Sequence, residues 1–186
     1  MCPGADTPSM VVVGMGNVLT GDDALGPTVV RMLDALWTLP PYVETVDAGT
    51  PGMDLAGLLA EVDAAIVVDT VAGDEPPGTI KRYDREQLLS RPLQPRTNPH
   101  APGLAETLFS LDLMEAGPGA VVLIGVIPKA VEVGTPLSCR VEAALPAAVA
   151  AVVRELASLG APPSRRRPPV KPDLWWQRSP ALSGRR

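Results

Sequence analysis

The sequence is poor in the features that mark membrane proteins and secreted proteins. Its longest apolar runs, such as 64–68 and 120–127, are far shorter than the roughly 18 residues that a membrane-spanning helix needs. The N-terminus does not have the basic and apolar regions of a secretory signal. The two cysteines, Cys2 and Cys139, form no CxxC or other metal-binding spacing, so no disulfide framework is expected. These absences predict a cytoplasmic protein without membrane contact.

The sequence also lacks the motifs of several common enzyme classes. It has no Gly-x-Ser-x-Gly elbow and no cysteine motif beside a base, so covalent acyl-enzyme chemistry is not supported. No HExxH helix is present, which excludes an ordinary zincin metallopeptidase. After Gly14-x-Gly16, the third glycine of a dinucleotide-binding loop would fall on Leu19. The first lysine of the chain is Lys81, so this loop has no P-loop lysine either, and nucleotide binding is not expected.

Charge and proline content divide the 186 residues into a body and a tail. Hydrophobic residues make up 46% of the chain and charged residues 20%, which suits one packed domain, placed at 1–160. Residues 161–186 contain seven basic residues, one acid and six prolines, so we predict an extended or disordered tail. In it, Trp175 and Trp176 are candidates for docking on the body or on a partner. The body carries a net charge of −11 and would repel phosphate, so no nucleic-acid partner is expected.

Short apolar runs alternate with segments of helical periodicity through the body. This alternation predicts an α/β protein, a three-layer α/β/α sandwich around a mostly parallel, twisted sheet of about five strands. In such sheets, ligands bind at the carboxyl ends of the strands. The expected strands are 10–13, 43–46, 64–68, 79–83 and 120–127, and the expected helices are 24–37, 53–61, 103–113 and 141–159.

The junction after the first strand contains two adjacent carboxylates, Asp22 and Asp23. Aspartate is a preferred N-cap and suits the positive end of a helix dipole, so one of the two is expected to cap the first helix. The other is then free to face the carboxyl edge of the sheet.

Three more side chains at strand or helix ends could complete a site. Asp69 ends an apolar strand, Asp47 ends the second strand, and His100, the only histidine of the chain, precedes a helix. Carboxylates with an imidazole suit Zn, Ni or a similar divalent ion. Each residue also has a plainer interpretation: Asp69 can initiate a turn, Asp47 can stabilise a glycine-containing turn, and a single loop histidine can be incidental.

Several of these motifs, in order, resemble the nickel–iron hydrogenase maturation endopeptidases. The similarity spans about 10–159 and leaves the tail outside. It rests on the glycine-rich junction with its paired acids, the segment after the second strand, the acid after the third strand, the histidine loop and the last strand: Gly14-Met15-Gly16-Asn17 through Asp22-Asp23-Ala24-Leu25-Gly26, Asp47-Ala48-Gly49-Thr50-Pro51-Gly52-Met53, Val68-Asp69, Pro99-His100-Ala101-Pro102-Gly103-Leu104 and Leu123-Ile124-Gly125-Val126-Ile127-Pro128.

The resemblance implies an endopeptidase that removes the C-terminal extension of a hydrogenase large-subunit precursor after nickel insertion. It implies Asp23, Asp69 and His100 as the metal-contacting trio, with the nickel supplied by the precursor and no organic cofactor. Asp47 would shape or assist the site. Some relatives have Glu where this chain has Asp23. The aspartate side chain is one methylene shorter, so its reach to a metal differs by that length. We expect a monomer that forms a transient complex with the large subunit.

Two other functions remain open at this point. A nickel-binding maturation chaperone would use the same trio without cutting the precursor. A metal-dependent peptidase with its own ion would cleave small peptides without a nickel-loaded partner and would contain metal when purified.

Overall fold

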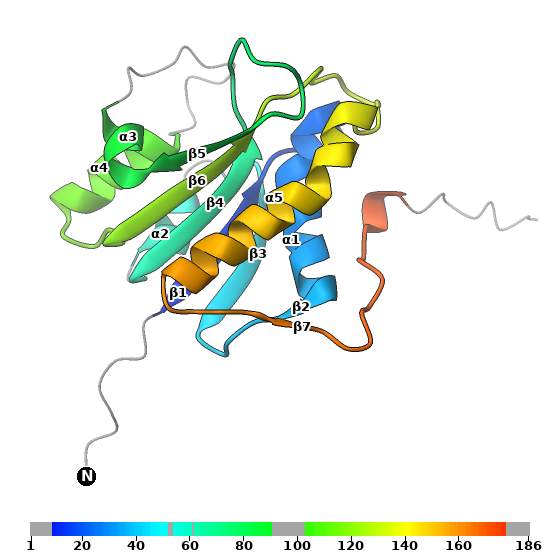
Figure 1. Ribbon diagram of the computed structural model, residues 1–186. Helices are drawn as coiled ribbons and strands as arrows, with labels where there is room; N and C mark the ends of the chain where they lie inside the picture. The colour runs from blue at the N-terminus through cyan, green and yellow to red at the C-terminus, as the bar shows by residue number, and fades with distance from the viewer. Residues whose placement is uncertain (1–8, 52–53, 61, 91–102, 178–186) are drawn as a thin grey trace, which may run out of the picture.

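The computed structural model describes residues 9–51, 54–60, 62–90 and 103–177 (Figure 1). A five-stranded sheet forms the centre, in the order β3-β1-β4-β6-β5. The first four strands of this order are parallel, and β5 runs antiparallel to β6. The strands of this sheet are β1 (Met10–Met15), β3 (Val43–Gly49), β4 (Ala64–Thr70), β5 (Ile80–Asp84) and β6 (Ala120–Val126).

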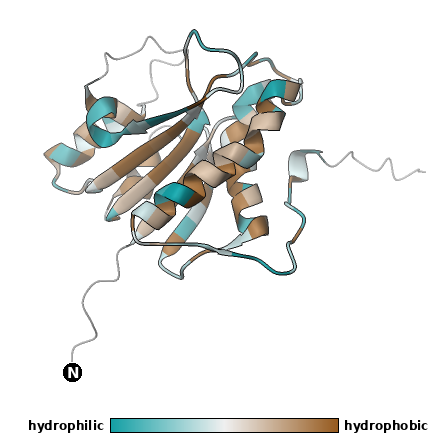
Figure 2. Cartoon of the chain, viewed as in Figure 1, coloured by the Kyte–Doolittle hydropathy of each residue, from teal (hydrophilic) through white to brown (hydrophobic). Residues whose placement is uncertain are grey.

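Two layers of helices cover the sheet, which confirms the predicted three-layer sandwich (Figures 1 and 2). The helices α1 (Leu25–Leu36) and α5 (Cys139–Ser158) cover one face. The helices α2 (Asp54–Leu59), α3 (Arg85–Leu89) and α4 (Leu104–Leu113) cover the other. Alternate residues of each strand serve the two layers, so the central strands are apolar on both faces. None of the helices in the parts of the chain that the structure describes is long and apolar enough to cross a membrane.

Strand β4 shows how the sheet places side chains near its carboxyl edge. Ile66 and Val68 pack against the layer of α1 and α5, whereas Ala65 and Val67 pack against the layer of α2 and α4. By the same alternation, Asp69 is directed to the α2 and α4 side and Thr70 to the α1 side.

Two glycines let α1 approach the sheet closely at this edge. A Cβ atom on Gly26, in the first turn of α1, would lie 2.2 Å from the carbonyl oxygen of Met15 and 2.5 Å from that of Val68. A Cβ atom on Gly14 would lie 2.4 Å from the carbonyl oxygen of Gly26. All three contacts are with backbone atoms, which cannot rotate away as a side chain can. Glycine at these positions therefore sets the depth at which α1 begins.

The structure contains elements that the sequence patterns did not predict. Helix α3 is one of them: Asp84 accepts a hydrogen bond from the backbone N of Gln87, and the Gln87 side chain accepts one from the backbone N of Asp84, which together form a capping box. The short strands β2 (Trp37–Thr38) and β7 (Ser164–Arg165) form a separate antiparallel pair.

Within the described part of the tail, 161–177, residues 164–170 contact β2 and the C-terminal end of α1. The backbone N–H groups of Arg166 and Val170 donate to the carbonyl oxygens of Leu36 and Ala35, at 2.9 and 3.0 Å. These carbonyls belong to the last turn of α1 and have no partner within the helix, so the tail supplies their hydrogen bonds. The Arg165 guanidinium also stacks over Trp37, 4.8 Å from the ring centroid.

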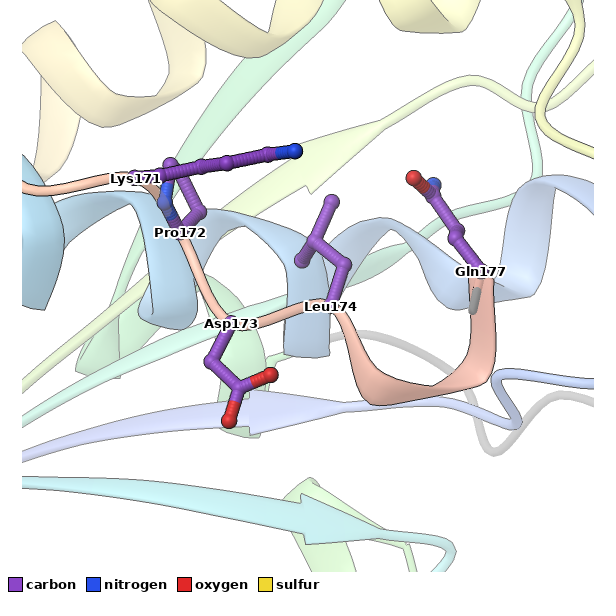
Figure 3. Close-up of a pocket in the computed structure, with 5 residues that line it drawn as sticks. All are labelled: Lys171, Pro172, Asp173, Leu174 and Gln177. Atoms are coloured by element: carbon purple, nitrogen blue, oxygen red, sulfur yellow. The ribbon is translucent and has the colours of Figure 1, made fainter. Parts of the chain in front are cut away.

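Beyond this contact, the described part of the tail ends with a 3₁₀ turn, Trp175–Gln177. Trp175 and Trp176 pack edge to face with ring centroids 5.7 Å apart, and Trp175 is 54% exposed. The tail lines a hollow of about 590 Å³ with Lys171, Pro172, Asp173, Leu174 and Gln177 (Figure 3). Asp23, Asp47 and Asp69 are not among the described residues that line this hollow.

Candidate active site

The loop between β1 and α1 folds back on itself through Gly16. This residue has a φ of 128°, and a Cβ atom there would lie 1.9 Å from the carbonyl oxygen of Asp23. Only glycine fits such an approach. The loop then enters a single 3₁₀ turn, Gly21–Ala24, which contains both carboxylates of the junction.

Asp23 is held between two hydrogen-bond donors. Its Oδ2 accepts a hydrogen bond of 2.7 Å from the backbone N of Asn17, and its Oδ1 accepts one of 3.2 Å from the Thr70 hydroxyl. The first bond closes the loop, and the second connects Asp23 to the end of β4. The carboxylate therefore lies at the carboxyl edge of the sheet, beside the strand that ends in Asp69 and Thr70.

Asp69 is the strongly perturbed acid of this edge. It is partly buried, its Oδ1 accepts a hydrogen bond of 2.7 Å from the backbone N of Thr70, and desolvation raises its pKa from 3.8 to about 7. The negative charge of Asp23 also raises this pKa, so the two carboxylates interact. A pair of acids with one pKa near neutrality is typical of functional sites and attracts a cation, which would relieve the repulsion.

The prediction that one of the paired acids caps the first helix is wrong. Neither the 3₁₀ turn nor α1 has a side-chain hydrogen bond at its N-cap. Asp22 is instead 1% exposed, and its carboxylate bonds to residues 129, 130 and 138 of the connection between β6 and α5. Asp23 is the acid at the carboxyl edge, where it accepts hydrogen bonds from Asn17 and Thr70.

Asp47 faces a different part of the molecule. It lies in β3, and its Oδ2 is 3.2 Å from a guanidinium nitrogen of Arg31 on α1. Thr45, two residues earlier on the same face, donates to Asp34 of α1. Asp47 is thus directed to the α1 layer, whereas Asp69 is directed to the α2 and α4 layer. The structure brings Asp23 and Asp69 together and gives Asp47 a separate partner.

His100 lies outside the described residues. Among the residues that the structure does describe, no group of three or more His, Cys, Asp or Glu side chains could hold a metal ion. The described part of the site is therefore a pair of carboxylates, Asp23 and Asp69, with hard oxygen donors that suit a divalent cation.

A sequence model of the hydrogenase maturation proteases matches residues 27–155, more than half of the chain. The chain belongs to the hydrogenase maturation protease family. This places it among endopeptidases and confirms the family indicated by the ordered motifs.

Individual relatives agree over nearly the whole body. The Hydrogenase 2 maturation protease of Escherichia coli K12 is 34% identical over 152 residues, which cover 81% of this chain and 92% of that protein. The hydrogenase expression/formation protein HupD of Rhizobium leguminosarum bv. viciae is 32% identical over 154 residues, covering 82% of this chain and 76% of the relative. The structure of the hydrogenase maturating endopeptidase HybD from E. coli superimposes with a TM-score of 0.77 at 33% identity, over 86% of this chain and 98% of that one.

In this hydrogenase maturation protease, two residues that donate hydrogen bonds to Asp23 were not predicted as site residues from the sequence. Thr70 donates to Asp23 and Asn17 donates to Asp23, yet neither residue type is diagnostic of a site. The position of Thr70 did contain a signal. It follows Asp69 at the end of a buried strand. Successive side chains of a strand point to opposite faces of the sheet, so two consecutive polar residues can each contact a different element.

Proposed function

We propose that this protease removes the C-terminal extension of a nickel-containing hydrogenase large-subunit precursor after nickel has been inserted. The family membership supports the class of reaction and of substrate. The observation that carries the site assignment is the interacting pair of Asp23 and Asp69 at the carboxyl edge of the sheet.

The nickel belongs to the substrate in this proposal. Asp23 and Asp69, with His100, which precedes α4 in the sequence, contact the nickel of the precursor and thereby hold its C-terminal segment beside the two carboxylates. A divalent ion compensates the repulsion between the acids and displaces the proton that Asp69 retains near neutral pH. The nickel either polarises the scissile carbonyl, activates water or serves for recognition.

This arrangement makes cleavage a checkpoint. Without nickel, the precursor offers nothing to balance the two carboxylates, and it binds weakly. With nickel, it completes a coordination shell that neither protein provides alone. The enzyme acts on its partner as a monomer in a transient complex in the cytoplasm, without a nucleic acid or a membrane.

Asp47 contributes at a distance in this proposal. Its ion pair with Arg31 connects the end of β3 to α1, the helix that follows the loop with Asp23. We therefore assign to Asp47 a supporting role in the shape of the site, without direct contact with the substrate.

The test is a cleavage assay on the large-subunit precursor, followed by the mobility shift on a denaturing gel. Wild type should cut the nickel-loaded precursor and leave the nickel-free one intact. Asp23→Asn and His100→Ala should abolish cleavage while keeping the far-ultraviolet circular dichroism of wild type. Asp63→Asn is the matched control, because Asp63 bonds to the backbone N of Ser9 at the opposite edge of the sheet.

Each other outcome has a defined meaning. Tight association of wild type with the nickel-loaded precursor, without a cut, would replace this proposal by a chaperone function. Cleavage of short peptides by protein that is purified with its own metal would indicate a peptidase with a resident ion. Normal processing by His100→Ala would remove the histidine from the site.

A further inference from the structure

Among the described residues near the candidate site, the buried carboxylate of Asp22 accepts the most hydrogen bonds. Its Oδ2 accepts from the backbone N of Lys129 at 2.7 Å, from that of Ala130 at 3.2 Å and from the Ser138 hydroxyl at 2.9 Å. Its Oδ1 accepts from the backbone N of Ser138 at 2.6 Å. The residue is 1% exposed, so water does not compete for these bonds.

These bonds join two loops that are more than a hundred residues apart in the sequence. The backbone repeats the connection on either side of the carboxylate: Asp22 N donates to the carbonyl of Ala130 at 3.1 Å, and Gly134 N donates to that of Leu19 at 2.8 Å. Gly21, with a φ of 56°, lies so close that a Cβ atom would be 2.7 Å from the Thr135 hydroxyl. The connection between β6 and α5 therefore holds the 3₁₀ turn that bears Asp23.

The turn needs such a support because it cannot fix itself. It is four residues long and has no side-chain hydrogen bond at its N-cap. The carboxylate of Asp23 stabilises the loop through Asn17 and Thr70, but an oxygen that binds a metal is no longer fully available to these donors. The bonds of Asp22 use donors other than Asn17 and Thr70, so they do not depend on the partners of Asp23.

We propose that Asp22 is a positioning residue, which fixes the direction of Asp23 by anchoring its turn to the connection between β6 and α5. This inference rests on the proposed function, in which Asp23 contacts the nickel of the precursor. It assigns different tasks to two neighbouring acids: Asp23 meets the substrate, and Asp22 holds the frame.

The substitution Asp22→Asn tests this anchor without changing its size. Both carboxylate oxygens accept from backbone N–H groups, Oδ1 from Ser138 and Oδ2 from Lys129 and Ala130. An amide has one oxygen and one NH₂ group, so in either orientation a backbone N–H faces another donor. The variant must therefore lose the backbone hydrogen bonds either to Ser138 or to Lys129 and Ala130.

A milder variant, Ser138→Ala, covers the case in which Asp22→Asn does not fold. Ser138 is the N-cap residue of α5, but its side chain makes no capping bond and donates to Asp22 instead. Its replacement therefore removes one of the four bonds and leaves the three from backbone groups. Thr45→Val is the control, because it removes the bond to Asp34 between β3 and α1.

The kinetic test uses nickel-loaded precursor at a temperature where all variants are folded. We expect kcat to fall at least about tenfold in Asp22→Asn and about two- to fivefold in Ser138→Ala, with a rise in KM, because Asp23 also contacts the nickel that holds the precursor. Thr45→Val should keep wild-type kcat. Unchanged kcat in both anchor variants, or an equal fall in Thr45→Val, would overturn the inference.

Amide hydrogen exchange of the Asn17 N–H gives a second measurement that does not depend on activity. This group donates to Asp23, so its protection reports whether the carboxylate stays in place. Exchange should accelerate at least about tenfold in Asp22→Asn, relative to amides of β1, and should not change in Thr45→Val. If wild type fails to cleave the precursor, the proposed function fails, and the exchange data still decide whether Asp22 positions Asp23. Unchanged Asn17 exchange in both anchor variants would refute the positioning role.

Discussion

The carboxyl group of Asp69 should make this protein less stable as the pH rises. Burial raises its pKa in the folded protein from 3.8 to about 7, so the folded state binds the proton more tightly than the unfolded chain does. Below pH 3.8 the carboxyl group is protonated in both the folded and the unfolded state, so its ionisation does not lower the free energy of unfolding. Between about pH 4 and 7 the unfolded chain loses its proton first, and the free energy of unfolding falls by about 1.4 kcal/mol per pH unit.

The substitution Asp69→Asn removes this cost and keeps the local geometry. An amide oxygen can still accept the hydrogen bond from the backbone N of Thr70, and the side chain has nearly the same volume. The pKa difference of roughly three corresponds to a gain of up to about 4 kcal/mol above pH 7, and to about 1.5 kcal/mol at pH 5. The same variant should lose cleavage of the nickel-loaded precursor, because an amide is a poor metal ligand.

Urea unfolding at pH 5, 6, 7 and 8 measures the effect through the transition midpoint. Asp63→Asn, an exposed aspartate at the other edge of the sheet, reports the effect of the amide substitution itself. The reasoning is refuted if Asp69→Asn is no more stable than wild type at pH 8. It is also refuted if the difference between the two proteins does not widen from pH 5 to pH 8.

Three other changes test separate parts of the fold. Gly26→Ala should cost about 2–3 kcal/mol in urea unfolding, since its Cβ would lie 2.2 Å from a carbonyl oxygen of β1. Gly57→Ala, with nothing within 4 Å, should be neutral or stabilising by up to about 1 kcal/mol, and an equal loss in both would contradict the packing argument. Asp47→Asn should keep kcat for the precursor within about threefold and change stability by less than about 1 kcal/mol, because its ion pair with Arg31 is partly exposed. A loss of kcat as large as that of Asp23→Asn would place Asp47 in contact with the substrate. Truncation after residue 163 should lower stability by about 1–3 kcal/mol, since it uncovers the carbonyls of Ala35 and Leu36, and should not change kcat. An unchanged unfolding midpoint would show that the tail does not support α1.

Apolar patterning was sufficient to predict the central sheet. The runs in β1, β4 and β6 are buried on both faces, and such runs are typical of parallel strands between two helical layers. The direction of β5 could not be read in the same way. Its residues are only partly buried at one edge of the sheet, where the pattern does not distinguish a parallel strand from an antiparallel one.

The sequence predicted those features of the candidate site that depend only on where a residue lies in its strand or helix. Asp23 and Asp69 come at strand or helix ends, and parallel strands bring such ends to one edge, so their proximity followed from the fold class. The partner of Asp47 did not follow, because it depends on which face of β3 meets α1. The role of Asp22 also depends on a loop more than a hundred residues away, and sequence order gave no sign of it.

The different roles of Asp22 and Asp23 follow from the turn in which they lie. A 3₁₀ turn has about three residues per turn, so neighbouring side chains are directed about 120° apart. One of two adjacent acids in such a turn can therefore be buried against one loop while the next faces a strand end. Asp22 is 1% exposed among donors, whereas Asp23 reaches Thr70 at the end of β4. An α-helix beginning at the same place would use an acid as its cap, but this short turn directs one acid inward and leaves the other at the sheet edge, where we propose that it contacts the substrate.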